Sequence, residues 1–240
     1  MKDYSHRIGE RFKNKEDLGG YEFVIVEYKN RHDLWVEFQD KYKARVHTGY
    51  NACQKGEIKN PYHPSVCVVG KLGLMKDGSK PKTTDNGNLT REYALWSHML
   101  RRCYDDKLHE EHPTYKECTV CDRWLIFSNF LEDLPLIEGY EMWLNNPNER
   151  IALDKDSKVE GNKIYSLENC KFISGSDNSK ERIERYSTRK KVMAISLTEN
   201  KVIIFQSMHQ AEKLGFKNGA ICLCCQGKNK QHKGYKWKYI

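Results

Sequence analysis

The first third of the chain alternates apolar and polar residues with a period of two, which is typical of half-buried β-strands. Residues 21–28 (YEFVIVEY) are mostly aromatic or β-branched, residues 34–38 (LWVEF) alternate, and residues 43–50 (KARVHTGY) follow a charged turn. Such residues favour strands, and the polar stretch between the first two suits a hairpin. We therefore expect a small antiparallel sheet unit over residues 1–75. One face of its last strand would carry Lys41, Lys43, Arg45 and His47.

After residue 90 the apolar positions recur every three or four residues, as they do in an amphipathic helix. Residues 91–105 (REYALWSHMLRRCYD) predict one helix, and Thr90 is placed to cap it. A short extended piece and a second helix are expected within residues 113–134, with Trp124, Phe127 and Phe130 in the core. The intervening residues 76–90 hold Gly, Pro, Asn and Asp without an aliphatic cluster, which predicts a linker or exposed loop.

The last fifty residues show a mixed pattern. Residues 191–197 and 201–207 predict two strands joined by a polar turn, and residues 207–216 and 218–228 predict two short helices. A basic and aromatic strand, KGYKWKY, closes the unit. Two short helices joined by a turn with Gly and Asn are typical of a helix-turn-helix.

Residues 152–178 lie between the helical part and the last fifty residues. In this segment, turn-forming residues separate short apolar pieces: ALDKDSKVEGNKIYSLENCKFISGSDN. The pattern predicts a strand or loop followed by a hairpin. Residues 176–186 begin with good capping residues and should continue as a helix. This order is that of a ββα-metal unit, in which a hairpin and a helix hold one cation.

Charge is distributed unevenly along the 240 residues, whose formal net charge is +8. Residues 179–240 hold 14 Lys and Arg against 4 Asp and Glu, whereas residues 1–178 hold 27 against 29. A folded basic segment interleaved with aromatic residues favours a nucleic-acid partner, although a solvated basic tail has the same composition. No apolar run reaches the ~20 residues of a membrane span, and the N-terminus has no apolar signal region. We therefore expect a cytoplasmic protein with reduced thiols.

The run from Leu153 to Asn178 resembles the HNH endonucleases of phages and mobile introns. On the pattern of that family, Asp154 takes the place of the general-base His and Asp156 that of the family's Asp. Asn162 matches the hairpin Asn, Asn169-Cys170 replaces an Asn-Leu pair, and Asn178 matches the helical metal ligand. The resemblance implies catalytic roles for Asp154, Asn162 and Asn178, and Mg²⁺ or Mn²⁺ bound by Asp154, Asn178 and Asp156.

Two further resemblances extend over most of the chain. Residues 207–239 are similar to the helix-turn-helix repeat appended to intron-encoded homing nucleases, and the N-terminal sheet resembles small AP2-like β-modules. The fold implied is α+β, with residues 1–75 as a β-rich DNA-binding module, 76–90 as a linker, 91–186 as the HNH-like nuclease and 187–240 as the helix-turn-helix repeat. The resemblance also implies a phage-encoded protein that acts on double-stranded DNA in a bacterial host cell.

This chain departs from the family pattern because no His lies between His112 and His209. Asp has an unperturbed pKa near ~3.9, so it is a poor base at pH 7 but a good ligand for a hard cation. Either Asp154 and Asn178 hold the metal while the metal or an upstream His activates water, or catalysis is lost and the chain is a DNA-binding regulator. RNA binding through the basic tail is a third hypothesis. The upstream histidines are His98, His109 and His112.

The nine cysteines allow one candidate structural zinc site. Cys118 and Cys121 have the two-residue spacer of zinc knuckles, and Cys103 and Cys170 complete a set of four. The simpler interpretation is small buried thiols, since these spacings are not those of a standard finger.

DNA contacts are expected from the end of the nuclease unit and from the last unit. Lysines at this density meet phosphates, whereas base reading needs side chains near the start of the second helix. The expected DNA-binding residues are Arg182, Arg185, Arg189, Lys190, Lys217, Asn218, Gln226, Lys228, Lys230, Lys233, Tyr235, Lys236, Trp237 and Lys238.

Overall fold

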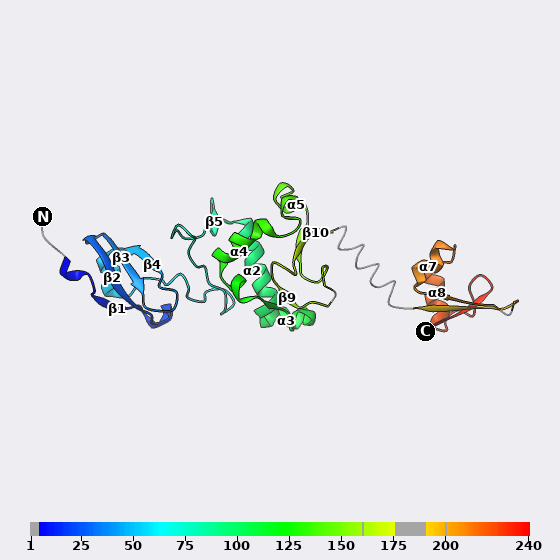
Figure 1. Cartoon of the computed structure of the whole chain (residues 1–240). Helices are drawn as coiled ribbons and strands as arrows, with labels where there is room; N and C mark the ends of the chain where they lie inside the picture. Colours follow the sequence, from blue (N-terminus) through cyan, green and yellow to red (C-terminus); the bar gives the residue numbers. More distant parts are fainter. Residues whose placement is uncertain (1–4, 160, 176–190, 200) are drawn as a thin grey trace. The chain divides into compact units, whose positions relative to one another are not determined.

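The computed structural model describes residues 5–159, 161–175, 191–199 and 201–240, and it has the predicted α+β class with several small sheets (Figure 1). The chain forms two compact units, one of Met1–Pro147 with Leu153–Phe172 and one of Asn148–Ala152 with Ile173–Ile240. Among the described residues, no helix combines the length and the apolar character required to cross a bilayer.

The N-terminal sheet is four-stranded and antiparallel, in the order β1 (Arg11–Lys13), β2 (Glu22–Asn30), β3 (Asp33–Phe38), β4 (Arg45–Thr48). Alternation buries Phe23 and Ile25 in the first half of β2 and every second residue of β3, so their inner faces make a core. The 3₁₀ turns η1 (Ser5–Arg7) and η2 (Glu16–Leu18) flank β1. Fully buried members of this core are Phe23, Ile25, Leu34, Val36 and Phe38.

The outer strand face of this sheet differs from the prediction. β4 begins at Arg45, so Lys41 and Lys43 lie in the preceding turn rather than on the strand. Arg45 and His47 do face outward, but each is paired within the sheet: Arg45 Nε lies 3.2 Å from Glu37 Oε2, and His47 Nε2 lies 2.9 Å from Asp33 Oδ1. The face therefore carries neutralised pairs and not a row of free cations.

A short helix, α1 (Tyr50–Lys55), follows the sheet and was not predicted. It ends at Gly56, whose φ of 64° is left-handed. A Cβ on Gly56 would lie 2.8 Å from the carbonyl oxygen of Lys13, so glycine is needed both for the turn and for the close approach to β1.

Residues 76–90 contain a small hairpin, β5 (Thr84–Asp85) with β6 (Asn88–Leu89). Its two turn residues, Asn86 and Gly87, both have positive φ, as a type I′ turn requires.

The helical part begins with α2 (Arg91–Tyr104), and the predicted cap is confirmed because Thr90 Oγ1 accepts a 3.2 Å hydrogen bond from Tyr93 N. Next come α3 (Asp106–Glu111), η3 (Pro113–Tyr115), β7 (Thr119–Val120), η4 (Asp122–Leu125), α4 (Phe127–Asp133), η5 (Leu134–Leu136) and α5 (Tyr140–Asn145). Trp124, Phe127 and Phe130 are fully buried, as predicted. The second helix is broken at Ile126, which is extended and bridges to Lys71.

Three short strands complete the first unit and begin the second: β8 (Ile151–Asp154), β9 (Ile164–Tyr165) and β10 (Lys171–Ser174). β8 and β10 form a two-stranded sheet, while β9 runs parallel to β7 with Val120 opposite Tyr165. The helix predicted over residues 176–186 lies outside the described residues.

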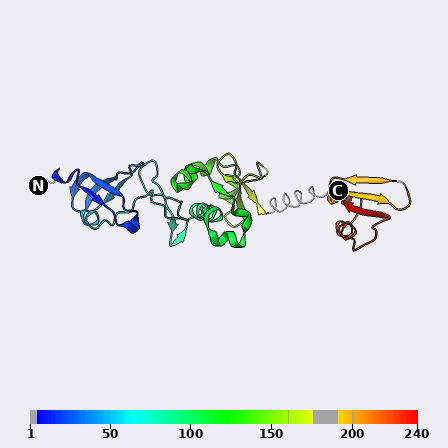
Figure 2. The same cartoon turned by 90° about the horizontal axis from the view of Figure 1, so that it is seen from below.

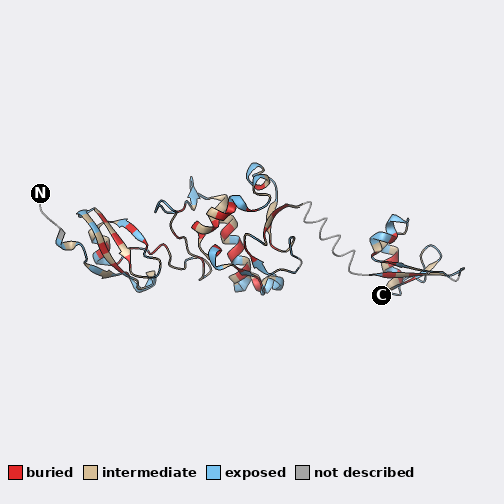
Figure 3. Ribbon diagram, viewed as in Figure 1, coloured by how far each residue is buried: buried red, intermediate tan, exposed pale blue. Residues whose placement is uncertain are grey.

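The C-terminal elements are β11 (Val192–Ser196), β12 (Val202–Phe205), α7 (Met208–Lys213), α8 (Asn218–Cys225) and β13 (Tyr235–Tyr239), as the pattern predicts. The sheet order is β12-β11-β13, and both helices lie on one face of it (Figures 1 and 2). Ser207 caps α7 by accepting from Gln210 N. Figure 3 marks buried positions on the ribbon of this unit. Its hydrophobic core includes Val192, Ala194, Phe205, Ala211, Ile221 and Trp237.

Candidate functional site

Asp154 ends β8 and organises the loop that follows it. Its Oδ2 accepts hydrogen bonds from the backbone N–H groups of Asp156 (3.2 Å) and Ser157 (2.7 Å), and from the Ser157 hydroxyl. An aspartate that binds backbone groups two and three residues ahead stabilises a turn. One oxygen of Asp154 is therefore occupied in shaping the loop.

The environment of Asp154 decides its charge. Burial raises the pKa of this carboxyl, but the hydrogen bonds from Ser157 and Asp156 together outweigh burial, so its pKa lies below the usual value. Asp154 is therefore ionised at neutral pH. An ionised, hydrogen-bonded carboxylate is a weak base but a suitable ligand for a hard divalent cation.

Asn162 ties together the two ends of this loop. Its Nδ2 donates to the carbonyl oxygens of Lys155 (2.7 Å) and Ile164 (2.8 Å). Its Oδ1 accepts from Ile164 N at 3.3 Å and from Asn169 Nδ2 at 3.2 Å. The residue that follows Asp154 is thus fixed to β9, and the position of Asp154 is set by a side chain eight residues away.

Two cations lie over the ring of Tyr165, beside the Asp154 loop. The Lys155 ammonium is 5.8 Å from the ring centroid and the Arg102 guanidinium carbon is 5.3 Å from it. Lys155 is buried, and Arg102 Nε is a buried atom without a hydrogen-bond partner in the part of the chain that the structure describes. Burial raises the pKa of Tyr165 far above its usual value, so the ring stays neutral and does not neutralise either cation. Positive charge of this kind suits a phosphate oxygen.

The three upstream histidines differ in whether their side chains are free to act as a general base. His109 is buried, and its Nε2 donates to the carbonyl oxygen of Arg102 at 2.9 Å, so it holds α3 against α2. His98 is exposed on α2, and His112 is exposed at the end of α3 with its ring 6.3 Å from that of Tyr115. His109 is therefore committed to structure and is a poor candidate base.

The metal ligands expected from the sequence are only partly described. Asp154 and Asp156 lie together in the loop, whereas Asn178 lies outside the described residues, as do Arg182, Arg185, Arg189 and Lys190. Across the described ranges, no group of three or more His, Cys, Asp or Glu side chains is placed to hold a metal ion. The two aspartates alone are an incomplete ligand set.

The zinc hypothesis stays a prediction, with no support from the described residues. All four cysteines of the set are described, and they do not form a metal-binding cluster. Cys103, Cys118 and Cys170 are buried, and burial raises the pKa of Cys103 and of Cys170 to about 12. These cysteines are small core residues, which was the simpler interpretation.

The expected DNA-binding residues of the last unit fall into two classes. Trp237 is a correction, because it is buried, stacks on Phe205 with ring centroids 5.7 Å apart, and donates from Nε1 to His232 O. Tyr235 and Asn218 are half-buried, and Lys233 Nζ donates to Gly215 O at 2.8 Å. The exposed members are Lys217, Gln226, Lys228, Lys230, Lys233, Lys236 and Lys238.

Several residues that shape these sites were not identified from the sequence. The serine three positions after Asp154 is a recognisable signal for a turn, so Ser157 was predictable from that spacing. Arg102 and Lys155 carried no such signal, because only the fold brings them to one aromatic ring.

Comparisons with known proteins add little to this geometry. No protein-family model matches the chain, and no curated protein matches it. Among solved structures, the one titled "DNA binding and cleavage by the HNH homing endonuclease I-HmuI" is similar over 39% of this chain and 60% of that chain, at 20% identity and a TM-score of 0.20. We draw no conclusion about fold or function from a likeness at this level.

Proposed function

We propose that this protein binds double-stranded DNA and cleaves or nicks it at the Asp154 loop with the help of a divalent cation. The observation that carries the proposal is the braced loop, in which Asn162 fixes the backbone next to an ionised Asp154. A fixed, ionised carboxylate beside a second carboxylate is an arrangement suited to metal-assisted phosphodiester hydrolysis.

The residues present fit a hard cation in chemistry, since Asp154 and Asp156 offer oxygen donors. Asn178 is proposed as the third ligand, and Mg²⁺ or Mn²⁺ as the metal. When bound, such an ion would stabilise the negative charge that develops on the phosphate. Asn162 would keep the carboxylate in place, and Arg102 and Lys155 would attract the phosphate oxygens of the approaching strand.

The second unit is proposed to supply most of the affinity for DNA. Its exposed lysines would neutralise phosphates without choosing a sequence, and base reading would fall to Lys217 and Asn218 at the start of α8, with Gln226 at its end. We also propose that residues 187–240 form a helix-turn-helix repeat, that residues 1–75 form an AP2-like module, and that the protein is encoded by a phage.

One observation favours a second candidate, a DNA-binding protein without catalysis. Asp154 Oδ2 already accepts three hydrogen bonds from its own loop, which is the role of a turn-forming aspartate. In that case the loop would act as a rigid part of a DNA clamp or regulator.

The test uses supercoiled plasmid with Mg²⁺ or Mn²⁺, an EDTA control and the variant Asp154→Ala. Asp77→Ala is the matched control, because Asp77 Oδ1 likewise accepts from a backbone N–H two residues ahead, Ser79 N at 2.9 Å, in a different loop. The nuclease proposal is supported if the plasmid is nicked or linearised, if EDTA and Asp154→Ala abolish this cleavage, and if Asp77→Ala leaves it intact. Binding that persists in EDTA with no cleavage by either metal supports the clamp, and competition by RNA against duplex DNA tests the RNA hypothesis.

A further inference from the structure

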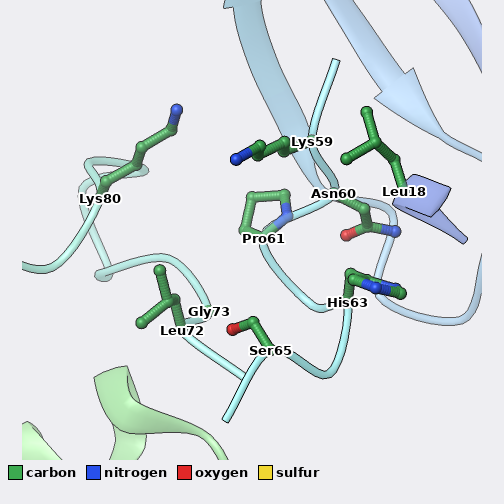
Figure 4. Close-up of a pocket in the computed structure, with 9 residues that line it drawn as sticks. All are labelled: Leu18, Lys59, Asn60, Pro61, His63, Ser65, Leu72, Gly73 and Lys80. Carbon is green, nitrogen blue, oxygen red and sulfur yellow. The ribbon is translucent and has the colours of Figure 1, made fainter. Parts of the chain in front are cut away.

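A cavity of about 270 Å³ lies in the first unit, between η2, the Pro-rich segment after α1, and the loop that carries Lys80 (Figure 4). Three apolar side chains, Leu18, Pro61 and Leu72, line it. Its size is near the lower end of the ~300–1,000 Å³ found for small-molecule sites, and an apolar lining with few polar groups is their usual composition.

The walls of this cavity are held by hydrogen bonds. Gly73 N donates to Pro61 O at 2.9 Å, and His63 N donates to Asn60 O at 3.0 Å. Asn60 is buried, and its side chain is fully used, since Nδ2 donates to Asp40 Oδ2 at 2.8 Å and Oδ1 accepts from Tyr62 N at 2.9 Å. The cavity is therefore preformed, and little ordering would be needed on binding.

The charge at the rim is positive. Lys59 and Lys80 reach the cavity from different segments, and Figure 4 shows the Lys59 side chain extending toward the segment that carries Lys80. No carboxylate is among the lining residues, and within the described ranges neither lysine forms an ion pair. The His63 ring completes the rim, with Nδ1 at 3.4 Å from Tyr21 Oη.

An apolar floor beneath unpaired lysines matches a ligand with a flat, weakly polar part and an anionic part. We propose that this cavity binds one unpaired nucleotide, with its base on Leu18, Pro61 and Leu72 and its phosphate between Lys59 and Lys80. A base has apolar faces that such a floor accepts, and two ammonium groups fit a phosphate. The nucleotide is either free or part of a single strand. The site is separate from the Asp154 loop and does not depend on cleavage.

The experiment measures binding of dAMP to the full chain by calorimetry, with deoxyadenosine and inorganic phosphate as partial ligands. Lys59→Ala/Lys80→Ala is expected to weaken dAMP binding about tenfold or more, because both phosphate contacts are lost. Ser65→Trp keeps both lysines but places a large ring at the cavity, so it should block binding by filling the space. Deoxyadenosine and phosphate should each bind more weakly than dAMP.

The control is Lys76→Ala/Lys82→Ala, which removes two positive charges from the segment that carries Lys80 without altering the cavity lining. Three results would overturn the proposal, because each indicates only a surface attraction for anions. They are equal weakening of dAMP binding by this control, full dAMP binding by Ser65→Trp, and competition by phosphate as strong as that by dAMP. A single-stranded oligonucleotide that displaces dAMP identifies a strand as the source, and failure to displace identifies free nucleotide. Asp154→Ala should bind dAMP as the wild type does, so loss of cleavage and loss of this site are distinguishable.

Discussion

The amide group of Asn162 holds the backbone of Lys155, donating from Nδ2 at 2.7 Å to the carbonyl oxygen that follows Asp154 in the chain. The same group also donates to Ile164 O at 2.8 Å, so one side chain connects the Asp154 loop to β9. The location of the carboxylate thus depends on an amide that itself bears no charge.

Asn162→Ala should loosen this loop. Two backbone carbonyls lose their partner, which we expect to cost about 1–2 kcal/mol of unfolding free energy and, if the loop cleaves DNA, about 10–100-fold in rate. Urea unfolding and plasmid nicking measure the two effects. Asn145→Ala is the control, because the one hydrogen bond described for the Asn145 side chain is a 3.5 Å contact with Glu141. Equal stability of the two variants would contradict the bracing role.

Asp154 should make the protein sensitive to acid. Its pKa is lowered on folding from 3.8, so its stabilisation is complete above about pH 4 and is lost as the pH falls through the folded pKa. Asp154→Asn should therefore be less stable than the wild type at pH 6, and the difference should shrink toward pH 3. Chemical denaturation at both pH values tests this. A difference that stays constant with pH would show that the charge is not responsible.

His232 should give the second unit a different pH response. Its Nε2 accepts from Lys217 N at 3.1 Å, which requires the neutral ring. Desolvation, and then the nearby Lys233 and Lys217, lower the pKa of His232 below 6.5. The stabilisation of the second unit by the neutral His232 ring is therefore complete above pH 6.5 and is lost as the pH falls through the folded pKa of His232.

His232→Gln keeps an acceptor that does not titrate, so it should flatten this pH dependence. The indole N–H resonance of Trp237 reports the change by NMR, because Trp237 Nε1 donates to His232 O at 3.2 Å. His209→Gln is the control, since His209 is exposed and pairs only with Glu212 among the contacts described for it. A wild-type pH profile in His232→Gln would refute the assignment.

Lys228 and Lys230 are exposed after α8 and should contact phosphates. Replacing both with Ala should weaken DNA binding similarly for different sequences and reduce the slope of log K against log salt by about 2. Fluorescence anisotropy at several salt concentrations measures this slope. Lys13→Ala/Lys15→Ala removes the same charge from residues paired with Glu16 and Glu57, and it should leave the slope unchanged. Equal slopes for both variants would exclude a direct contact.

Local pattern was sufficient for much of the fold. Thr90 and Ser207 cap the helices that follow them because each needs only a hydroxyl at the right position. The alternation in β2 and β3 likewise predicted their buried faces. The break at Ile126 was not predictable from helical periodicity, because it depends on pairing with Lys71, 55 residues earlier in the chain.

Less of the candidate site could be predicted from the sequence, because the site also depends on contacts between residues that are far apart in the chain. Asp154 and Asn162 were named from the resemblance of their segment to the HNH pattern, whereas the cation pair at Tyr165 arises only when α2 and β9 meet. Trp237 was expected to contact DNA because it lies among lysines, yet the strand alternation places it on the inner face of β13. In a strand, neighbours in sequence point to opposite sides, so a basic aromatic run divides into a charged face and a core face.

The parallel pairing of β7 with β9 also determines when the Asp154 loop forms during synthesis. β7 leaves the ribosome first, but β9, its partner among the described residues, becomes available only when residues 164–165 emerge. The hydrogen bonds of the loop join residues 154–169, so the loop can close against β7 only after these residues have been translated. Incomplete chains that stop before this point would lack the loop, while the N-terminal sheet could already have folded.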